Sequence, residues 1–255
     1  MVHWHFFRPS SIRSVLPWLL IAIAARPGEA AAFGSDFTCG GSLAFTSDFI
    51  YRGLSESGGS GAAQAELHVD SAGSFLGVWG STRDNNFDPY ADYDVEVYLG
   101  HHFELDNAWS ASLAARARYY VAGNQPFSND YQELIGSLTY LDVWSLSLTA
   151  IPNAVQYWYD NRLGRTSAWV AESTGQWLLV DRLFATGSVG YYYASGTGPG
   201  VQAANHYAYG NLGLAFEYRR WRLDAGYFLT QERAQQLTPY PIANQRFAAT
   251  LAWRF

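Results

Sequence analysis

Apolar residues recur at every second position of this chain, often over ten residues or more, and this period restricts what it can fold into. Residues 63 to 70 read AQAELHVD, and residues 93 to 100 read YDVEVYLG. Successive side chains of a strand point to opposite faces, so each such segment has one apolar and one polar face. The pattern predicts an all-β chain whose strands lie between an apolar and a polar medium.

The first 32 residues have the features of a secretory signal peptide. Arg8 and Arg13 give a basic start, residues 15 to 25 form an apolar stretch, and residues 30 to 32 are three alanines suited to cleavage. The stretch is shorter than the roughly twenty residues of a spanning helix, and no later window holds eighteen consecutive apolar residues. We therefore expect a signal peptide at 1–32 and a β-barrel at 33–255, since only helices and closed barrels satisfy the backbone in lipid.

Twelve segments have the strand pattern, which predicts a transmembrane antiparallel up-and-down β-barrel of about twelve strands. The expected limits are 42–53, 62–70, 73–81, 92–103, 108–121, 130–140, 143–151, 166–179, 183–194, 206–218, 221–230 and 245–255. Five short turns alternate with six longer polar or glycine-rich loops. This alternation is typical of an even-stranded barrel with both chain ends in the periplasm.

Composition agrees with a lipid-facing surface. Only 15% of residues are charged, against about a quarter in soluble domains. All 16 basic residues are Arg and the 22 acidic residues outnumber them, which excludes the basic footprint of a nucleic-acid-binding protein. Cys39 is the single cysteine and cannot form an internal disulfide. We expect outer-membrane lipid as the partner and the bacterial outer membrane as the location.

Aromatic residues of apolar parity cluster at the two strand ends. Tryptophans next to the short turns predict a periplasmic girdle, comprising Trp109, Trp144, Trp177, Trp221 and Trp253. Tyrosines at the opposite ends predict an outer girdle, comprising Tyr51, Tyr93, Tyr119, Tyr193 and Tyr227. The last strand alternates up to the terminal Phe255, an ending that resembles the signal read by the barrel-assembly machinery.

Two stretches carry a family resemblance. Residues 43–55, reading LAFTSDFIYRGLS, together with GVWGS at 77–81, resemble the amino-terminal signature of the TorF-type porins of proteobacteria. The resemblance implies an outer-membrane barrel without a defined substrate or catalytic residue. The chain departs from the family in its long fourth loop around residues 157–159, where a specificity of its own could reside, and its fifth loop is glycine-rich at 195–200.

Polar parity directs the remaining charged strand residues into the lumen, where they are candidates for lining a pore. They are Asp48, Glu66, His68, Asp94, Glu96, Arg116, Arg118, Glu133, Glu172, Glu217, Arg222, Asp224, Arg246 and Arg254. The alternative is that these groups are only solvated or paired with one another. Acidic residues outnumber arginines in the set, which indicates a weak cation preference.

Hairpin register predicts ion pairs in this set. A three-residue turn at 105–107 places Glu96 opposite Arg116 and Asp94 opposite Arg118, and a turn at 219–220 places Glu217 opposite Arg222. Directly opposed charges stabilise a strand pair by roughly 0.2 to 1 kcal/mol each.

The favoured function is a porin that allows passive diffusion of small solutes or ions through a narrow charged lumen. A closed structural or adhesive barrel, its loops carrying the function, is the alternative. A lipid-active enzyme would need a serine beside a histidine, and the sequence identifies no such pair. A metal site at His101, His102, Glu104 and Asp106 is disfavoured because adjacent strand residues point to opposite faces. A secreted β-sandwich would have shorter strands and no paired aromatic belts. We expect no enzyme activity, no cofactor and no metal.

Overall fold

A computed structural model describes residues 37–84, 91–121, 129–157, 163–195, 206–238 and 241–255. These residues contain fourteen strands and one 3-10 helix, η1 (Glu232–Gln236). The strands are β1 (Thr38–Thr46), β2 (Ile50–Tyr51), β3 (Leu54–Ser55), β4 (Ala62–Ser71), β5 (Ser74–Thr82), β6 (Tyr93–Glu104), β7 (Trp109–Val121), β8 (Tyr131–Tyr140), β9 (Trp144–Tyr157), β10 (Leu163–Val180), β11 (Leu183–Ala194), β12 (His206–Tyr218), β13 (Trp221–Thr230) and β14 (Arg246–Arg254). The expected signal peptide lies outside the described residues.

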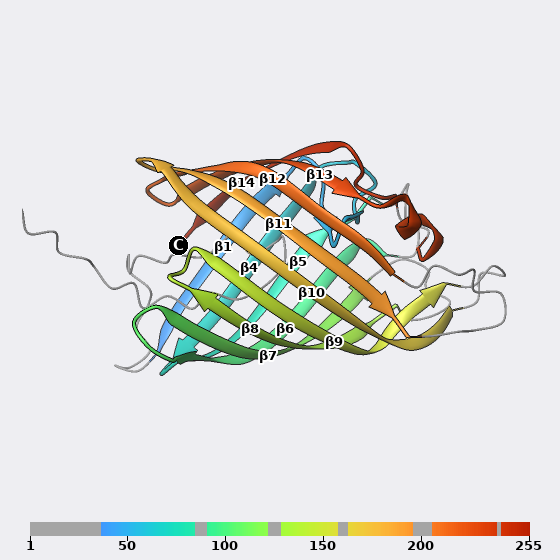
Figure 1. Cartoon of the computed structure of the whole chain (residues 1–255), viewed down its shortest axis with the longest axis horizontal. Helices are drawn as coiled ribbons and strands as arrows, with labels where there is room; N and C mark the ends of the chain where they lie inside the picture. The colour runs from blue at the N-terminus through green and yellow to red at the C-terminus, as the bar shows by residue number, and fades with distance from the viewer. Residues whose placement is uncertain (1–36, 85–90, 122–128, 158–162, 196–205, 239–240) are drawn as a thin grey trace, which may run out of the picture.

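Twelve of the strands form one closed antiparallel barrel, as the sequence predicted. Each pairs with its neighbour along the chain, and β1 closes the ladder by pairing with β14 from Ser42↔Arg254 to Thr46↔Thr250. The short turns and the C-terminus lie at one end of the barrel (Figure 1). The other end carries the longer connections, so the alternation of short and long connections is also found.

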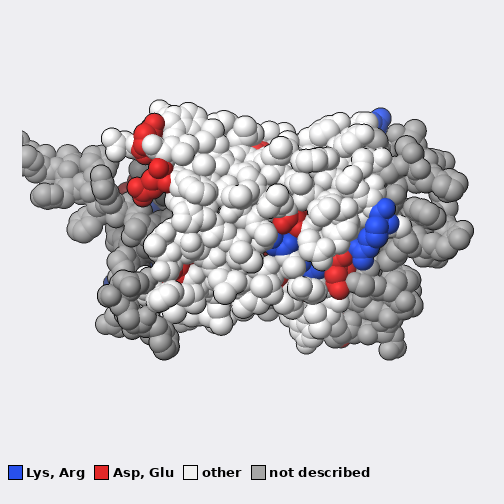
Figure 2. All heavy atoms as spheres, turned by 90° about the horizontal axis from the view of Figure 1, so that it is seen from below, with Lys and Arg blue, Asp and Glu red and all other residues white. Residues whose placement is uncertain are grey.

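The outer surface of the barrel is apolar. Leu43, Leu67, Leu99 and Leu212 are among its exposed side chains, and Phe247 is 80% exposed. Figure 2 shows one face, where uncharged residues cover most of the surface. A closed barrel of this kind leaves no unpaired edge and offers lipid an apolar wall, which is how strands cross a bilayer. Among the described residues, no helix is long and apolar enough to cross a membrane.

The first predicted strand, at 42–53, is wrong in its second half. β1 ends at Thr46, and the next residues form a separate hairpin, β2–β3, that belongs to no part of the barrel wall. Its two-residue turn is Arg52-Gly53, with φ of 49° and 76°. Positive φ at both positions defines the type I′ turn that closes tight hairpins. The alternation of apolar and polar residues that predicted one strand therefore runs on through residues 47–53, although the chain reverses direction at this turn.

The register predicted for the β6–β7 hairpin is also wrong. Glu96 pairs with Arg118, and Asp94 pairs with Tyr120. The reason lies in the turn, where the carboxylate of Asp106 accepts hydrogen bonds from the backbone N–H groups of Ala108 and Trp109 at 2.7 Å each. This places the centre of the turn one residue farther along the chain than predicted. The β12–β13 register, with Glu217 opposite Arg222, is confirmed.

Glycines on the inner face make room for tyrosine rings from the neighbouring strand. A Cβ added at Gly77 would collide with the ring of Tyr98, and one added at Gly190 would collide with the ring of Tyr209. Both tyrosines are directly opposite these glycines in the ladder. Each ring therefore packs over the glycine of the adjacent strand, and its hydroxyl reaches the next strand of the barrel wall.

We expect Gly77→Ala to lower the free energy of unfolding by about 1 to 3 kcal/mol, the usual cost of overpacking. Chemical unfolding of the refolded barrel in detergent measures this change. Gly136→Ala is the matched control, because a Cβ there meets nothing within 4 Å. Equal stability of the two variants would contradict the packing argument.

Candidate functional site: a hairpin inside the barrel

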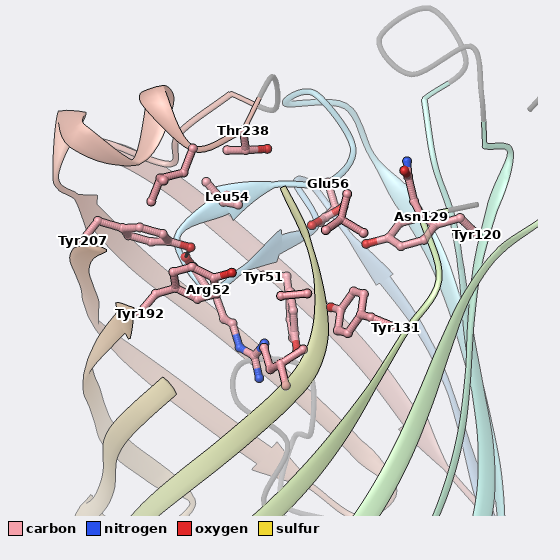
Figure 3. A pocket seen from close by; sticks show the side chains of 14 residues that line it. Tyr51, Arg52, Leu54, Glu56, Tyr120, Asn129, Tyr131, Tyr192, Tyr207 and Thr238 are labelled. Carbon is pink, nitrogen blue, oxygen red and sulfur yellow. Dashed lines mark hydrogen bonds between the residues drawn. The ribbon is translucent and has the colours of Figure 1, made fainter. Parts of the chain in front are cut away.

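The hairpin β2–β3 lies within the barrel and is almost completely buried. Residues 49–52 are each 4% exposed or less and residues 55–57 are at most 3% exposed, while Leu54 after the turn is half-buried. Figure 3 shows Tyr51, Arg52 and Leu54 inside the ring of strands at the end with the long connections. The first long loop therefore occupies lumen space.

Asp48 fixes the base of the hairpin. Its carboxylate accepts hydrogen bonds from the hydroxyls of Ser55 at 2.6 Å and Ser57 at 3.1 Å, which lie on the returning arm. The guanidinium of Arg246 on β14 adds an ion pair at 3.0 Å. These bonds hold both arms together and tie them to the strand that closes the barrel.

The tip of the hairpin is tied to β12, to β13 and to the residues that precede β14. The carbonyl of Gly53 accepts hydrogen bonds from the Thr230 hydroxyl at 2.9 Å and the Ala243 N–H at 2.7 Å. The Tyr207 hydroxyl on β12 donates to the carbonyl of Arg52 at 3.1 Å. With both base and tip anchored, the hairpin crosses the lumen as a bar.

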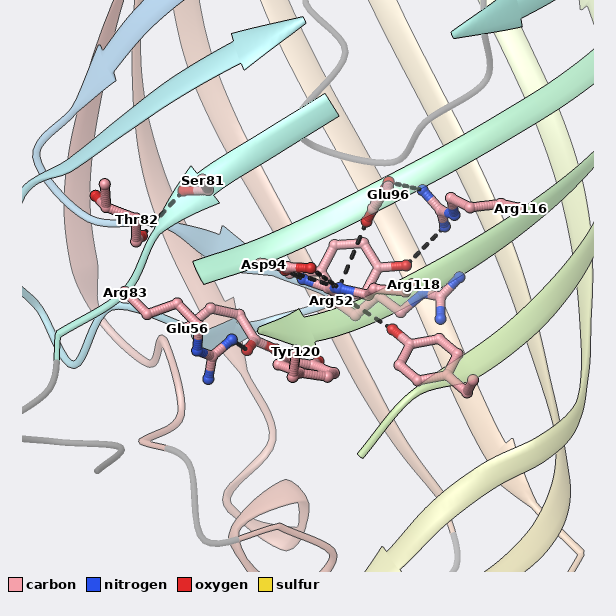
Figure 4. Close-up of polar contacts among 12 residues, drawn as sticks. Arg52, Glu56, Ser81, Thr82, Arg83, Asp94, Glu96, Arg116, Arg118 and Tyr120 are labelled. Atoms are coloured by element: carbon pink, nitrogen blue, oxygen red, sulfur yellow. Dashed lines mark hydrogen bonds and ion pairs between the residues drawn. The ribbon is translucent and has the colours of Figure 1, made fainter. Parts of the chain in front are cut away.

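One side of this bar packs on a cluster of buried ion pairs from β6, β7 and β8. Arg52 Nη1 lies 2.6 Å from Glu133 Oε1, and the same carboxylate binds Arg116. Arg116 also lies 3.0 Å from Glu96, and Arg118 binds Asp94 with Nε 2.8 Å from Oδ2. Figure 4 shows Asp94 and Glu96 of β6 meeting Arg116 and Arg118 of β7.

The ion pairs Glu96–Arg116 and Asp94–Arg118 were predicted, although the register that was to produce them is wrong. They form diagonally across the ladder, because long side chains reach the neighbour two residues away. The third predicted pair, Glu217–Arg222, is 2.8 Å apart, and Arg222 also binds Asp224 at 2.8 Å.

Tyr51 was predicted to belong to the outer girdle, and the structure corrects this. Its side chain is 4% exposed inside the barrel, and its hydroxyl accepts a hydrogen bond from Arg116 Nη2 at 2.8 Å. The guanidinium carbon of Arg118 lies 4.1 Å from the centroid of its ring. Burial raises the pKa of the Tyr51 phenol well above its usual value, so the group stays neutral.

Two lumen carboxylates bind tyrosines instead of arginines. The Tyr98 hydroxyl donates to Glu66 Oε1 at 2.5 Å, and the Tyr209 hydroxyl donates to Glu172 Oε1 at 2.6 Å. These are the two tyrosines that lie over Gly77 and Gly190. In both places the ring crosses a glycine strand and bonds a carboxylate two strands away.

A pocket lies beside the hairpin at the end with the long connections. We call it the vestibule; its lining includes Arg52, Leu54, Ile151, Tyr192, Tyr207 and Leu237 (Figure 3). Tyr192 and Tyr207 stack with their centroids 5.2 Å apart. The vestibule therefore combines aromatic and aliphatic side chains with polar ones, which include Arg52, Glu56 and Asn129 (Figure 3).

All fourteen predicted lumen residues lie on the inner side of the barrel, Asp48 at the hairpin base and the others on strands. That they line a solute path stays a prediction. The five girdle tryptophans keep the outward parity near the short turns, and Tyr93, Tyr119 and Tyr193 are at least 40% exposed. Tyr227 packs on Phe247 with their ring centroids 4.7 Å apart.

Sequence reasoning missed Arg52, Tyr98 and Tyr209. Arg52 was read as part of a wall strand, and the two tyrosines were not distinguished from other aromatic strand residues. A glycine at the same depth on the adjacent strand could have identified both tyrosines.

The described residues contain no group of three or more His, Cys, Asp or Glu side chains that could hold a metal ion. His101 Nδ1 does lie 2.9 Å from the hydroxyl of Ser74 on the outer face. In the part of the chain that the structure describes, no carboxylate or amide side chain bonds the other ring nitrogen of His101.

Comparisons with known proteins give a family and a fold. The model of the family described as "Bacterial protein of unknown function (Gcw_chp)" matches residues 30–226. No curated protein matches the sequence. The fold is similar to the NanC porin, with a TM-score of 0.53 at 10% identity over 85% of this chain and 98% of that chain. The KdgM porin in complex with disordered oligogalacturonate gives a TM-score of 0.49 at 8% identity, over 86% of this chain and 98% of that one.

The bacterial family, the closed barrel and its apolar outer wall together identify an outer-membrane protein. A soluble β-sandwich is excluded by the closure of the ladder.

We expect Glu133→Gln to destabilise the barrel by about 3 to 5 kcal/mol, because it leaves the buried guanidinium groups of Arg52 and Arg116 without their shared carboxylate. Chemical unfolding gives the magnitude, and hydrogen exchange should increase selectively in residues 49–57. Glu104→Gln, an exposed position near a short turn, is the control. Unchanged exchange in the hairpin would show that this ion pair does not hold it.

Proposed function

This chain belongs to the Gcw_chp family of bacterial proteins, whose function is unknown, and we propose that it is a porin-like channel for small solutes or ions. The observation that carries the proposal is a closed twelve-stranded barrel whose inward side chains near the short turns, such as Thr174 and Ser188, stay partly exposed, because side chains do not fill this part of the lumen. The TorF-type resemblance supports the same proposal, since its signature at residues 43–55 covers the end of β1 and the hairpin.

Burial inside the barrel changes along its axis. Near the long connections, inward residues on both sides are buried: Glu96 on β6 and Val170 and Glu172 on β10 are each at most 3% exposed. Nearer the short turns, inward residues such as Thr174 and Ser188 are partly exposed. The path we propose runs from the vestibule past the hairpin and then between the inward side chains toward the short turns.

The partners follow from the same proposal. Outer-membrane lipid covers the outer wall, and small solutes or ions are the cargo. Phe255 exchanges backbone hydrogen bonds with Gly41 on β1 at the seam of the barrel, at 3.0 and 3.1 Å. We infer that this final strand is the part read by the barrel-assembly machinery.

Replacing residues 49–57 by a flexible glycine-serine segment should raise single-channel conductance several-fold, since it removes the narrowest part of the path. Planar-bilayer recording of the refolded protein measures this. Arg182→Ser in an exposed turn is the control and should conduct like the unaltered protein. If neither the protein nor the hairpin variant gives conductance steps, the barrel is closed and the structural or adhesive alternative is favoured.

Selectivity should favour cations weakly, because Glu66 and Glu172 face the lumen with tyrosine partners and no arginine within an ion-pair distance of 4.0 Å among the described residues. Reversal potentials in a potassium chloride gradient measure the preference. Glu172→Gln, which keeps an acceptor for Tyr209, should reduce it. A reversal potential that favours anions in the unaltered protein would contradict this prediction.

A further inference from the structure

The short turns of the barrel differ in charge from one side to the other. Asp106 and Asp142 are the only charged residues in the turns between β6 and β7 and between β8 and β9. The three arginines of the short turns all lie in the last two, Arg182 between β10 and β11 and Arg219-Arg220 between β12 and β13. Asp181 is the one carboxylate in these last two turns, so together they carry an excess of positive charge.

Two of these arginines converge on one tyrosine. The guanidinium carbons of Arg182 and Arg219 each lie 5.3 Å from the centroid of the Tyr218 ring, within the range of a cation–π contact. The backbone also joins the two turns, because the N–H of Glu217 donates to the carbonyl of Arg182 at 2.9 Å. Two neighbouring hairpins therefore hold two like charges beside the same ring.

This cluster is open to the outside of the barrel. The side chain of Arg182 is 51% exposed, and Arg219 and Tyr218 are exposed as well. The carboxylate of Asp181 lies 3.2 Å from Nε of Arg182, but its side chain is 88% exposed. An ion pair this exposed contributes little, so a second anion can still bind the arginines.

Aromatic and apolar side chains continue from the cluster along the outer wall. Tyr218 pairs with Trp221, and Trp221 pairs with Trp253 on the next strand. Rings of this kind gather where a membrane meets water. Phe216 lies two residues before Tyr218, so it points to the same outer face, and it is also exposed. An occupant that matches both parts of this surface has an anionic group for the arginines and an apolar part for the wall.

We propose that Arg182, Arg219 and Tyr218 form a docking site for an anionic phospholipid of the periplasmic leaflet. The short turns of outer-membrane barrels face the periplasm, so this leaflet meets the cluster. Phosphate oxygens accept charge-assisted hydrogen bonds from guanidinium groups, often two at a time, and the acyl chains pack on Phe216 and the wall beside it. An acidic headgroup such as phosphatidylglycerol is favoured over phosphatidylethanolamine, because the arginines repel the ammonium of the latter. The site lies outside the lumen and does not depend on whether the barrel conducts.

The first experiment is native mass spectrometry of the refolded protein in detergent with equal amounts of palmitoyl-oleoyl phosphatidylglycerol and palmitoyl-oleoyl phosphatidylethanolamine. The two lipids have the same acyl chains, so any preference arises from the headgroup. We expect phosphatidylglycerol to remain bound in preference, and equal retention of the two lipids overturns the proposal. A competition with sn-glycerol 3-phosphate tests whether the acyl chains matter. Displacement of the lipid by equimolar glycerol phosphate would show a site for soluble phosphate compounds and also overturn the proposal.

The second experiment uses the double variant Arg182→Gln with Arg219→Gln. Its preference for phosphatidylglycerol should fall about twentyfold, since each arginine near an anionic lipid contributes roughly fivefold in affinity. The matched control is Arg165→Gln with Arg233→Gln, which removes the same charge from exposed positions at the end with the long connections. The control should keep the preference. An unchanged preference in the first variant, or an equal loss in the control, contradicts a localised site.

A third variant separates charge from structure. Arg182→Lys with Arg219→Lys keeps both positive charges, so it should retain a preference for phosphatidylglycerol well above that of the glutamine variant. Loss equal to that of the glutamine variant would show that the arginines act only by packing on Tyr218, and the proposal would fail. Heat-dependent mobility in gel electrophoresis confirms that each variant has refolded before its lipids are counted.

Discussion

Closure of the backbone ladder between β1 and β14 is the constraint on which the rest of this structure depends. In lipid no water can satisfy a free N–H or carbonyl group, and each one costs several kcal/mol, so a sheet that enters the bilayer must have no edge. Once the ladder is closed, successive side chains of each strand point alternately to the outside and to the inside of the barrel. The apolar half faces lipid, and the other half, which holds most of the charged residues of the strands, is directed into an interior of fixed width.

That interior is filled unevenly. On the side of β4 to β8, inward residues form ion pairs and aromatic contacts, and the hairpin packs on them through Phe49 and Tyr51. Nearer the short turns, smaller polar side chains such as Thr174 and Ser188 remain partly exposed. A twelve-stranded barrel lies between small barrels filled by side chains and wide aqueous pores. Here one inward-folded loop, residues 47–57, occupies part of the lumen near the long connections.

Buried ion pairs are costly to assemble, and their value here is in position rather than in net stability. The carboxylate of Glu133 binds one arginine of the hairpin and one of the barrel wall. Losing it therefore removes an ion-pair partner from two buried guanidinium groups at once. Asp48 similarly joins both arms of the hairpin to β14. The signature TSDFIYRGLS at residues 46–55 therefore encodes a self-contained bar, with an acidic base, an aromatic arm and an arginine at the turn.

The sequence by itself determined the closed barrel, the alternation of connections and the inward direction of residues such as Glu96, Arg116 and Glu172, because the two-residue period of a strand is local. Only the tertiary structure decided where the chain leaves the wall. Residues 47–53 keep a strand-like pattern, yet the carboxylate of Asp48, the positive φ of Arg52 and Gly53 and the charged wall of β6 to β8 draw them into the lumen. The partners of Tyr98 and Tyr209 were also beyond the sequence, because a contact across two strands depends on register, and register is set by turns such as that at Asp106 rather than by the period.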